Sequence, residues 1–457
     1  MRTERDSMGT MEVPDEALYG AQTARALANF PVSGIRFGRD FIRALGEIKR
    51  AAARINAGRL GESRSRAIVT ACDEVIEGAL DDHFVLDIFQ TGSGTSTNMN
   101  ANEVIANRAM QLAPGCAVHP NDHVNMGQSS NDVIPSAIHI AAAELAFHRL
   151  MPALERLEEA IAERAAAFAD VVKIGRTHLM DATPITLGQE LSGWARQVAL
   201  ARQRLEGVRP RICELAQGGT AVGTGLNSTE GFGAAIADEL AARYRLPFTE
   251  AENHFEAQAA QDAAVELSGQ LRTIAASLMK IANDVRLLNA GPRCGIGEIR
   301  VPAVQPGSSI MPGKVNPVMA ESLAMVCAQV MGNDATIGIA GASGLLDLNV
   351  MLPVIAHNLL QSLDILASSC RLFADRCIAG MEANRERCRE QVEWSMAMVT
   401  ALAPVIGYDS AAELAKEAVR EGKTVRELCR ERAILPEAEL ERLLDPRAML
   451  HPRREEG

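Results

Sequence analysis

The chain has 457 residues, of which 47% are hydrophobic and 23% are charged, so it can bury a large core. Its formal net charge of −12 and the lack of a basic stripe argue against nucleic-acid binding. No uninterrupted apolar run in the sequence is long enough to span a bilayer, so we expect no membrane association.

The cysteine pattern and the N-terminus both favour a cytoplasmic protein. Nine cysteines lie between Cys72 and Cys429 without a C-x-x-C pair, which predicts free thiols in a reducing compartment. The first residues are charged and lack the apolar segment of a signal peptide. The cysteines are dispersed and no His/Asp cluster has ligand spacing, so we expect no metal site.

Aromatic residues make up only 4% of the chain, while Ala and Leu are plentiful, and this mix favours helices over sheets. Helices are predicted at 41–60, 62–82, 135–169 and 187–205, with a possible interruption at Pro152. Segments of small polar residues separate them, at 92–98, 119–124, 127–132, 175–184 and 218–225. Another helix, through 102–108, follows the first of these segments.

The clearest periodicity lies between 255 and 290. Apolar residues alternate steps of four and three at Leu267, Leu271, Ile274, Leu278, Ile281, Val285 and Leu288. This is an a/d heptad seam, which predicts a long helix packed lengthwise against others. Met319, Leu323, Val326 and Val330 continue the rhythm after Pro317, and a further helix is expected at 353–373. The fold class is therefore mainly α, with a central bundle of long helices.

Three domains are expected from the changes in texture along the chain. Residues 1–135 form a mixed, mostly helical N-terminal domain. Residues 136–385 form the long-helix bundle. Residues 386–457, in which the helices become shorter and more charged, form a small C-terminal helical domain.

The segment Gly307–Pro317 has the composition of an anion-binding loop. Gly307 and Gly313 permit backbone angles that side chains forbid. Ser308, Lys314 and Asn316 supply a hydroxyl, an ammonium and a carboxamide within ten residues, as a carboxylate-binding pocket requires. The alternative is a surface turn before a helix that begins near Pro317.

The other polar segments carry a similar set of neutral donors. They include Thr95, Ser96, Asn98, Ser129, Ser130, Asn131, Thr177 and His178. Each segment alone is more often a helix cap or an ordinary polar contact. Several of them between rigid apolar helices favour a functional site.

Together these motifs resemble the class II fumarases of the fumarase/aspartase superfamily. The matching segments occur in the family's order and cover nearly the whole chain: Leu18–Thr23, Gln90–Thr95, His119–Asp122, Gln128–Asp132, Gly175–His178, Ser277–Asp284, Gly291–Glu298 and Gly307–Pro317.

The resemblance implies a fold, an assembly and an activity. The fold is the mainly α, three-domain superfamily fold, whose central domains pool into a twenty-helix core in a homotetramer. Each active site is shared by three subunits and needs no cofactor. The implied reaction is the reversible addition of water to fumarate, giving (S)-malate through an aci-carboxylate carbanion.

The same resemblance implies the role of each site residue. Ser308 is the base, His178 is the acid, and Glu321 polarises His178 from two helical turns beyond Lys314. The substrate is held by Ser93, Gly94, Thr95, Ser129, Ser130, Asn131, Thr177, Ser309, Lys314, Val315 and Asn316.

A second, peripheral anion site is implied at His119, Pro120, Asn121 and Asp122. The family often has a basic residue just upstream, where this chain has Cys116 and Ala117, and this puts the affinity of the peripheral site in question. Phe89 stands where Trp is common, which we interpret as a change in packing.

Two alternatives remain open. An aspartate ammonia-lyase would share the serine loop and the bundle, but aspartases resemble one another in having Ala at the position of Gly313 and Gln at that of His178. An inert scaffold protein of the superfamily would be expected to lack one of the acid/base residues, and this chain has them all.

Overall fold

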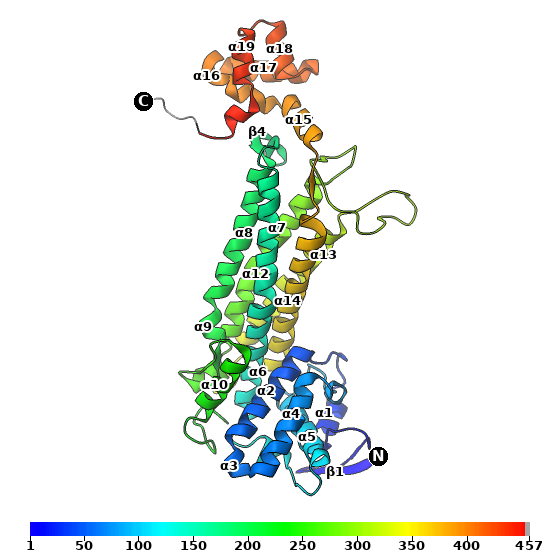
Figure 1. Ribbon diagram of the computed structural model, residues 1–457, viewed down its shortest axis with the longest axis vertical. Helices are drawn as coiled ribbons and strands as arrows, with labels where there is room; N and C mark the ends of the chain where they lie inside the picture. The colour runs from blue at the N-terminus through cyan, green and yellow to red at the C-terminus, as the bar shows by residue number, and fades with distance from the viewer. Residues whose placement is uncertain (453–457) are drawn as a thin grey trace. The chain divides into compact units, whose positions relative to one another are not determined.

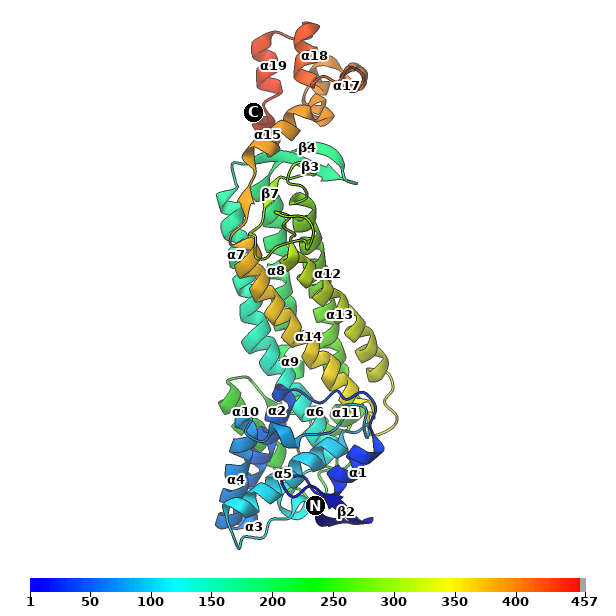
Figure 2. The same ribbon diagram turned by 90° about the vertical axis from the view of Figure 1, so that its right-hand side faces the viewer.

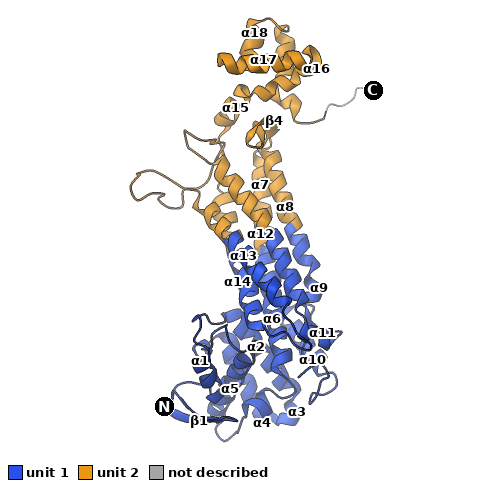
Figure 3. Cartoon of the chain, turned by 180° about the vertical axis from the view of Figure 1, so that it is seen from behind, with its two compact units in different colours: residues 1–152, 201–275, 326–368 blue, residues 153–200, 276–325, 369–457 orange. Residues whose placement is uncertain are grey.

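The computed structural model describes residues 1–452. Most of these residues are helical, which confirms the prediction of a mainly α fold (Figure 1). The chain packs as two compact units (Figure 3). Unit 1 comprises 1–152, 201–275 and 326–368, and unit 2 comprises 153–200, 276–325 and the residues from 369 onward. The division into three domains at 135 and 385 stays a prediction.

Unit 1 contains mostly short and medium helices. Its helices and helical turns are α1 (Ala21–Asn29), α2 (Arg39–Ile55), α3 (Ala57–Leu60), α4 (Glu62–Glu77), η1 (Asp81–His83), α5 (Thr95–Leu112), η2 (Pro120–Val124), α6 (Ser130–Glu144), η3 (Leu145–Leu150), α9 (Arg209–Ile212), α10 (Phe232–Tyr244) and α11 (His254–Ala259). Its strands are β1 (Arg2–Asp6), β2 (Gly9–Val13), β5 (Glu214–Leu215) and β6 (Thr249–Glu250).

Five long helices contribute residues to both units. They are α7 (Met151–Ala167), α8 (Leu187–Gly207), α12 (Asp262–Leu288), α13 (Val318–Gly341) and α14 (Leu352–Phe373). Within each unit, segments of these helices lie side by side (Figure 2). The predicted seam on α12 is confirmed, because all seven of its heptad residues are at most 5% exposed.

Unit 2 also contains the short elements of the C-terminal part of the chain. Its strands are β3 (Val172–Thr177), β4 (Met180–Thr186), β7 (Ile299–Arg300) and β8 (Glu382–Ala383). Its remaining helices and turns are η4 (Ala374–Ile378), α15 (Arg385–Trp394), η5 (Met396–Ala401), α16 (Ala403–Ile406), α17 (Tyr408–Glu421), α18 (Val425–Glu431), α19 (Glu437–Leu443) and η6 (Pro446–Met449).

The run from α6 to α7 differs from the single predicted helix at 135–169. It begins five residues earlier, at Ser130, and contains the π-helical turn η3 just before Pro152. A proline has no N–H to donate and its ring crowds the preceding turn. The wider π turn accommodates Pro152, and the helix continues beyond it.

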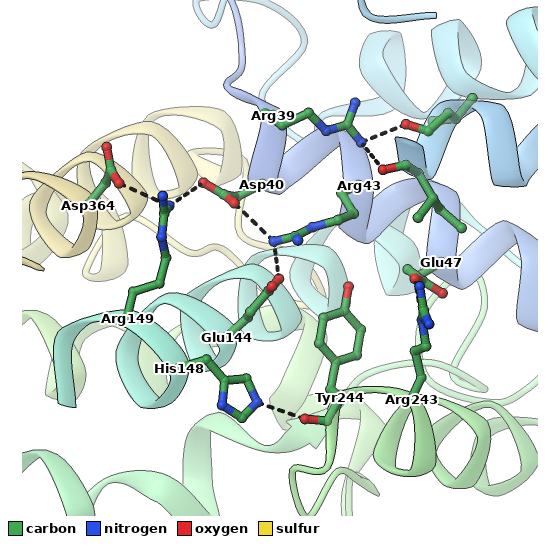
Figure 4. Close-up of polar contacts among 12 residues, drawn as sticks. Arg39, Asp40, Arg43, Glu47, Glu144, His148, Arg149, Arg243, Tyr244 and Asp364 are labelled. Atoms are coloured by element: carbon green, nitrogen blue, oxygen red, sulfur yellow. Dashed lines mark hydrogen bonds and ion pairs between the residues drawn. The ribbon is translucent and has the colours of Figure 1, made fainter. Parts of the chain in front are cut away.

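A chain of ion pairs in unit 1 joins α6 and η3 to α2 and α14 (Figure 4). Arg43 pairs with Asp40 at 3.0 Å and also with Glu144. Arg149 contacts Asp40 at 3.5 Å and Asp364 at 3.0 Å. Burial raises the pKa of Glu144, although the charge of Arg43 opposes this shift. The pairs hold α6 in place, and the first turn of α6 carries the predicted Ser/Asn motif.

Candidate active site

The predicted residues Ser93, Gly94 and Thr95 lie at the start of α5, with Gly94 as its N-cap. The helix begins at Thr95, so residues 95–98, expected to interrupt helical structure, belong to the helix. Ser93 Oγ lies 2.8 Å from Thr95 Oγ1. The Gln90 side chain accepts hydrogen bonds from Thr97 N at 3.0 Å and Thr97 Oγ1 at 2.8 Å, which anchors the turn.

The first turn of α6 carries Ser129, Ser130 and Asn131. Ser129 is the N-cap: its Oγ accepts from Asn131 N at 3.2 Å, and the Asp132 carboxylate accepts from Ser129 N at 2.9 Å. This is a capping box with Asp in the third position. Asn131 Nδ2 donates to Ala221 O at 2.7 Å, so the Gly-rich segment at 218–225 lies against this turn.

Asp132 is completely buried and also accepts from Thr220 N at 2.9 Å. Burial raises its pKa to about 7, against the hydrogen bonds it accepts and the charge of Lys49. Asp132 thus ties the α6 turn to the Gly-rich segment.

The N-terminal turns of α5 and α6 meet in unit 1. The two helices contact each other, and Asn98 Nδ2 donates to Ser130 Oγ at 3.1 Å. Helix N-termini carry free N–H groups and a partial positive charge, which favours anions. The predicted donors of these two turns therefore form one cluster that suits a carboxylate.

In unit 2, Thr177 and His178 lie at the exposed tip of the β3–β4 hairpin. Thr177 pairs with Met180, and the two residues between them are left-handed, with φ of 56° at His178 and 62° at Leu179. Such angles are typical of a type I′ turn, in which Asn and Gly are preferred. The structure thus replaces the irregular segment expected at 175–184 with a hairpin.

A buried ion cluster supports this hairpin. Lys173 is fully buried and contacts Glu190 at 2.9 Å and Glu298 at 3.1 Å. Arg176 pairs with Glu298 at 2.9 Å and donates to Gln391 at 2.9 Å. These pairs fix the strand that leads directly to Thr177.

The loop at 307–317 is closed by its own backbone. Gly307 N donates to Lys314 O at 2.7 Å, and Asn316 Nδ2 donates to Gly307 O at 2.8 Å. A Cβ on Gly307 would lie 2.7 Å from Lys314 O, so this closure requires glycine. Ser308 Oγ accepts from Ile310 N at 3.2 Å and from Met311 N at 3.0 Å. Two N–H donors favour negative charge on the serine oxygen.

Residues of this loop also border a cavity of about 430 Å³ in unit 2. Lys314, Val315 and Asn316 line it together with the cationic side chains of Arg286 and Arg300. Among residues 1–452, Lys314 forms no ion pair, so its charge is available to an anion. The cations and hydrogen-bond donors that line this cavity have the chemistry of a carboxylate site.

Glu321 lies in the first turn of α13 and is partly exposed. In the described chain neither Glu321 nor His178 forms a side-chain hydrogen bond or an ion pair. The predicted contact between these two residues is therefore not made within the chain.

The predicted peripheral residues lie at the start of η2. His119 is its N-cap and accepts from Asp122 N at 3.1 Å through Nδ1. Arg64, on α4, donates to Ala117 O at 2.9 Å. Burial and the charge of Arg64 lower the pKa of His123. A cation from another helix therefore lies where the local sequence has none.

The structure places these predicted residues in three groups, one in unit 1 and two in unit 2. Unit 1 holds Ser93, Gly94, Thr95, Ser129, Ser130 and Asn131 in one cluster. Unit 2 holds Thr177 and His178 on the hairpin, and Ser308, Ser309, Lys314, Val315 and Asn316 in the loop. The sequence reasoning missed Lys49 and Arg64, whose partners lie far away along the chain, so no local pattern could reveal them. It also missed Asp132, although the Ser129–Asp132 capping-box spacing is a local signal; only its bond to Thr220 is distant.

Family models and known relatives match most of this chain. A lyase family model matches residues 9–332, and a model described as the fumarase C C-terminus matches residues 398–451. The chain is 52% identical to the class II fumarate hydratase of Thermosynechococcus vestitus, with 98% of each chain covered. It is 56% identical to that of Halobacterium salinarum, over 98% of this chain and 97% of the relative.

Solved structures give the same result. The crystal structure of class II fumarase from Schistosoma mansoni superposes with a TM-score of 0.95 at 44% identity, covering 99% of this chain and 100% of that one. A fumarate lyase:delta crystallin from Brucella melitensis gives a TM-score of 0.93 at 46% identity, covering 99% and 100%. The resemblance seen in the motifs is thus confirmed, and the chain belongs to the class II fumarate hydratase family.

Proposed function

We propose that this protein catalyses the reversible hydration of fumarate to (S)-malate. The observation that carries the proposal is the Ser308 hydroxyl, which accepts two backbone N–H bonds in a loop that also carries Lys314 and Asn316. A serine is a weak base unless its alkoxide is stabilised. Two fixed N–H donors and a nearby ammonium supply that stabilisation.

In malate dehydration, Ser308 takes the proton from the carbon beside one carboxylate. The electron pair moves onto that carboxylate, giving an aci-carboxylate. When the double bond forms, the hydroxyl on the other carbon leaves with a proton from His178, as water. Hydration reverses each step: His178 accepts a proton from the attacking water, and Ser308 returns its own proton to carbon.

The remaining residues hold the substrate and its developing charge. Glu321 orients and polarises His178, since a carboxylate stabilises an imidazolium. Lys314 and Asn316, with Val315 and Ser309 beside them, bind one carboxylate. The helix-terminal donors bind the rest of the dicarboxylate: Ser93, Gly94, Thr95, Ser129, Ser130, Asn131 and, from the hairpin, Thr177. Preorganised donors of this kind favour the transition state over the substrate.

The active protein is proposed to be a cytoplasmic homotetramer whose sites each combine residues from three subunits. The outer side of α13 supports this assembly. A row of exposed residues spaced by three and four runs along it: Met325, Ala328, Gly332, Ala335 and Ile339. Met325 and Ile339 are each 69% exposed. Such a side packs against another helix of the same kind.

The helix α13 is also apolar and long enough to cross a membrane, with a mean hydropathy of 1.3. This differs from the expectation that no segment would pass that test. The alternating exposed side and the seam residues Leu323 and Val330, which are buried, favour a bundle helix over a lipid-facing one.

A peripheral anion site is proposed at His119, Pro120, Asn121 and Asp122. Arg64 supports it, because its guanidinium reaches the carbonyl of Ala117 and supplies positive charge that the neighbouring sequence lacks.

Absorbance of fumarate, with malate and aspartate as separate substrates, tests the function. We expect fumarate from malate alone, since His178 and Gly313 distinguish this chain from aspartases. Release from aspartate alone would favour the ammonia-lyase.

Ser308→Ala should lower kcat by about 10²–10⁴-fold. Ser309→Ala, in the same loop but without a backbone donor to its hydroxyl in the described chain, should lower it less. Full turnover by Ser308→Ala would contradict the mechanism and leave the scaffold alternative.

A further inference from the structure

Lys49, on α2, is a fully buried lysine beneath the two helix N-termini. Its exposed fraction is 0%, and its Nζ donates to Asn125 Oδ1 at 2.9 Å. It forms no ion pair among residues 1–452. Burial lowers its pKa to about 7, although nearby Asp132 and Cys72 oppose the shift. Burying an amine is costly, so we asked what this one does.

The side-chain oxygen of Asn125 accepts three hydrogen bonds. Besides Lys49 Nζ, both Asn98 Nδ2 and Asn102 Nδ2 donate to Asn125 Oδ1, each at 3.3 Å. Asn125 Nδ2 donates in turn to Gln128 O at 3.1 Å. The amine of Lys49 has N–H donors in both its charged and its neutral form, so either form can make this bond to Asn125 Oδ1. A flipped Asn125 would turn its NH₂ group toward Lys49, so Lys49 fixes the orientation of the amide.

The orientation of Asn125 then fixes that of Asn98. Because Asn125 turns its oxygen toward Asn98, Asn98 must turn its NH₂ group toward Asn125. The same Nδ2 donates to Ser130 Oγ at 3.1 Å. A hydroxyl has one proton, and Asn98 Nδ2 cannot accept it. The Ser130 O–H therefore points away from the network and is free to donate elsewhere. Ser130 retains 8% exposure.

This arrangement is not the one that would maximise stability. Asn98 Oδ1 and Asn102 Oδ1 are both buried and have no hydrogen-bond partner among residues 1–452. Leaving a buried acceptor unpaired is destabilising. The network thus holds the two amides in an orientation that lowers stability. What this orientation determines is the direction of the Ser130 O–H.

We propose that Lys49 is a positioning residue that acts through Asn125 and Asn98 to hold the Ser130 hydroxyl as a hydrogen-bond donor to a substrate carboxylate. We call Lys49, Asn125, Asn98 and Ser130 the amide relay. The inference rests on the proposed function, which places Ser130 against the dicarboxylate. Lys49 itself does not touch the substrate.

A double-mutant cycle on the whole protein tests the relay. The variants are Lys49→Met, Ser130→Ala and the double substitution, and the readouts are KM and kcat for malate with the melting temperature. A hydrogen bond to a charged group corresponds to roughly a ten- to hundredfold change in affinity. We expect KM to rise by that factor in both single variants, with a smaller change in kcat. In the Ser130→Ala background, Lys49→Met should raise KM no further.

Asn102→Ala is the matched control. It removes a buried donor to the same Asn125 oxygen, but Asn102 makes no hydrogen bond to Ser130 in the described chain. It should lower the melting temperature and leave KM unchanged. An equal rise in KM for Asn102→Ala, or additive effects of Lys49→Met and Ser130→Ala, would overturn the relay.

A second variant keeps the test decisive if Lys49→Met does not fold. Asn98→Asp places a carboxylate oxygen against Ser130 and draws its proton inward, so KM should rise, again without additivity to Ser130→Ala. Additivity there would also overturn the relay. An unchanged KM in Ser130→Ala alone would remove Ser130 from the proposed site, which separates failure of that assignment from failure of the relay alone.

Discussion

Gly94 lies so close to Ile134 that a Cβ on Gly94 would approach Ile134 Cγ2 to 2.9 Å. The φ of Gly94 is also left-handed, at 71°. Gly94→Ala should therefore push the α5 turn away from α6 and strain the backbone by about 1–2 kcal/mol. We expect a higher KM for malate and a lower melting temperature. Gly58→Ala, in α3 with no neighbour within 4 Å, is the control; it should leave KM unchanged and should not lower the melting temperature.

His178 can be separated from the turn that carries it. Because Asn tolerates left-handed angles, His178→Asn should preserve the hairpin and remove only the imidazole. We expect kcat to fall by about 10²–10⁴-fold, with little change in KM or melting temperature. Leu179→Gly, which relieves the neighbouring left-handed residue, should retain activity. An unchanged kcat for His178→Asn would exclude His178 as the acid.

Removing one charge of the ion cluster that supports the hairpin should lower stability more than removing two opposite charges together. Lys173→Met leaves Glu298, which is 0% exposed, with one cation fewer, and breaking a buried pair costs about 3–5 kcal/mol. Lys173→Met with Glu298→Gln removes both charges and should recover part of that loss. Urea denaturation measures the difference. The Glu298→Gln single variant completes the cycle, and a double variant whose loss equals the sum of the two single losses would show that the charges do not interact.

Asp87 should make unit 1 sensitive to acid. Burial alone would raise the pKa of Asp87. The hydrogen bonds from Phe89 N, Ser33 and Gly34 N outweigh burial and lower the pKa to about 2. The folded pKa is below the unfolded value near 3.8, so Asp87 stabilises the fold above about pH 4. That contribution is lost as the pH falls toward 2.

Melting curves between pH 7 and 2 check this sign. Asp87→Asn should melt at a lower temperature at pH 7 and show a smaller decrease on acidification. Asp347→Asn, at an exposed position, controls for loss of one negative charge. A parallel decrease in wild type and Asp87→Asn would contradict the prediction.

The outer side of α13 predicts the assembly state. Ile339→Glu places a charge on an apolar side that we expect to be buried between subunits, so the tetramer should dissociate and lose activity. Light scattering during gel filtration measures the mass. Val419→Glu makes the same kind of change at a residue that is 67% exposed on α17, and it should leave the mass unchanged. A fully active monomer would overturn the shared-site model.

The long helices were predictable because their signal is local and periodic. Leu267 to Leu288 repeat with helical spacing, and the core they form follows from that pattern alone. The hairpins were not predictable in the same way. The strand Arg2–Asp6 has no apolar alternation, and the turn at His178 and Leu179 lacks the Asn-Gly signal of a type I′ turn.

The residues of the candidate site were predictable from the sequence, but their arrangement in space was not. Family motifs identified the donors, yet nothing near Ser130 in sequence indicates Lys49, which lies about eighty positions away. The hydrogen bonds to Asn125 come from separate elements that meet only in the folded chain. Polar networks of this kind depend on tertiary contacts, so local sequence patterns cannot specify them.

The burial of the thiols offers a practical tool. Seven of the nine cysteines are buried, Cys116 is partly exposed, and Cys294 alone is classed as exposed. Burial raises the pKa of thiols such as Cys327 and Cys377 to about 12, which suppresses their reaction with maleimides. After Cys116→Ser, a fluorophore should attach at Cys294. Its neighbours Gly291, Pro292 and Gly297 line the loop cavity, so emission from that dye would report ligand entry in real time.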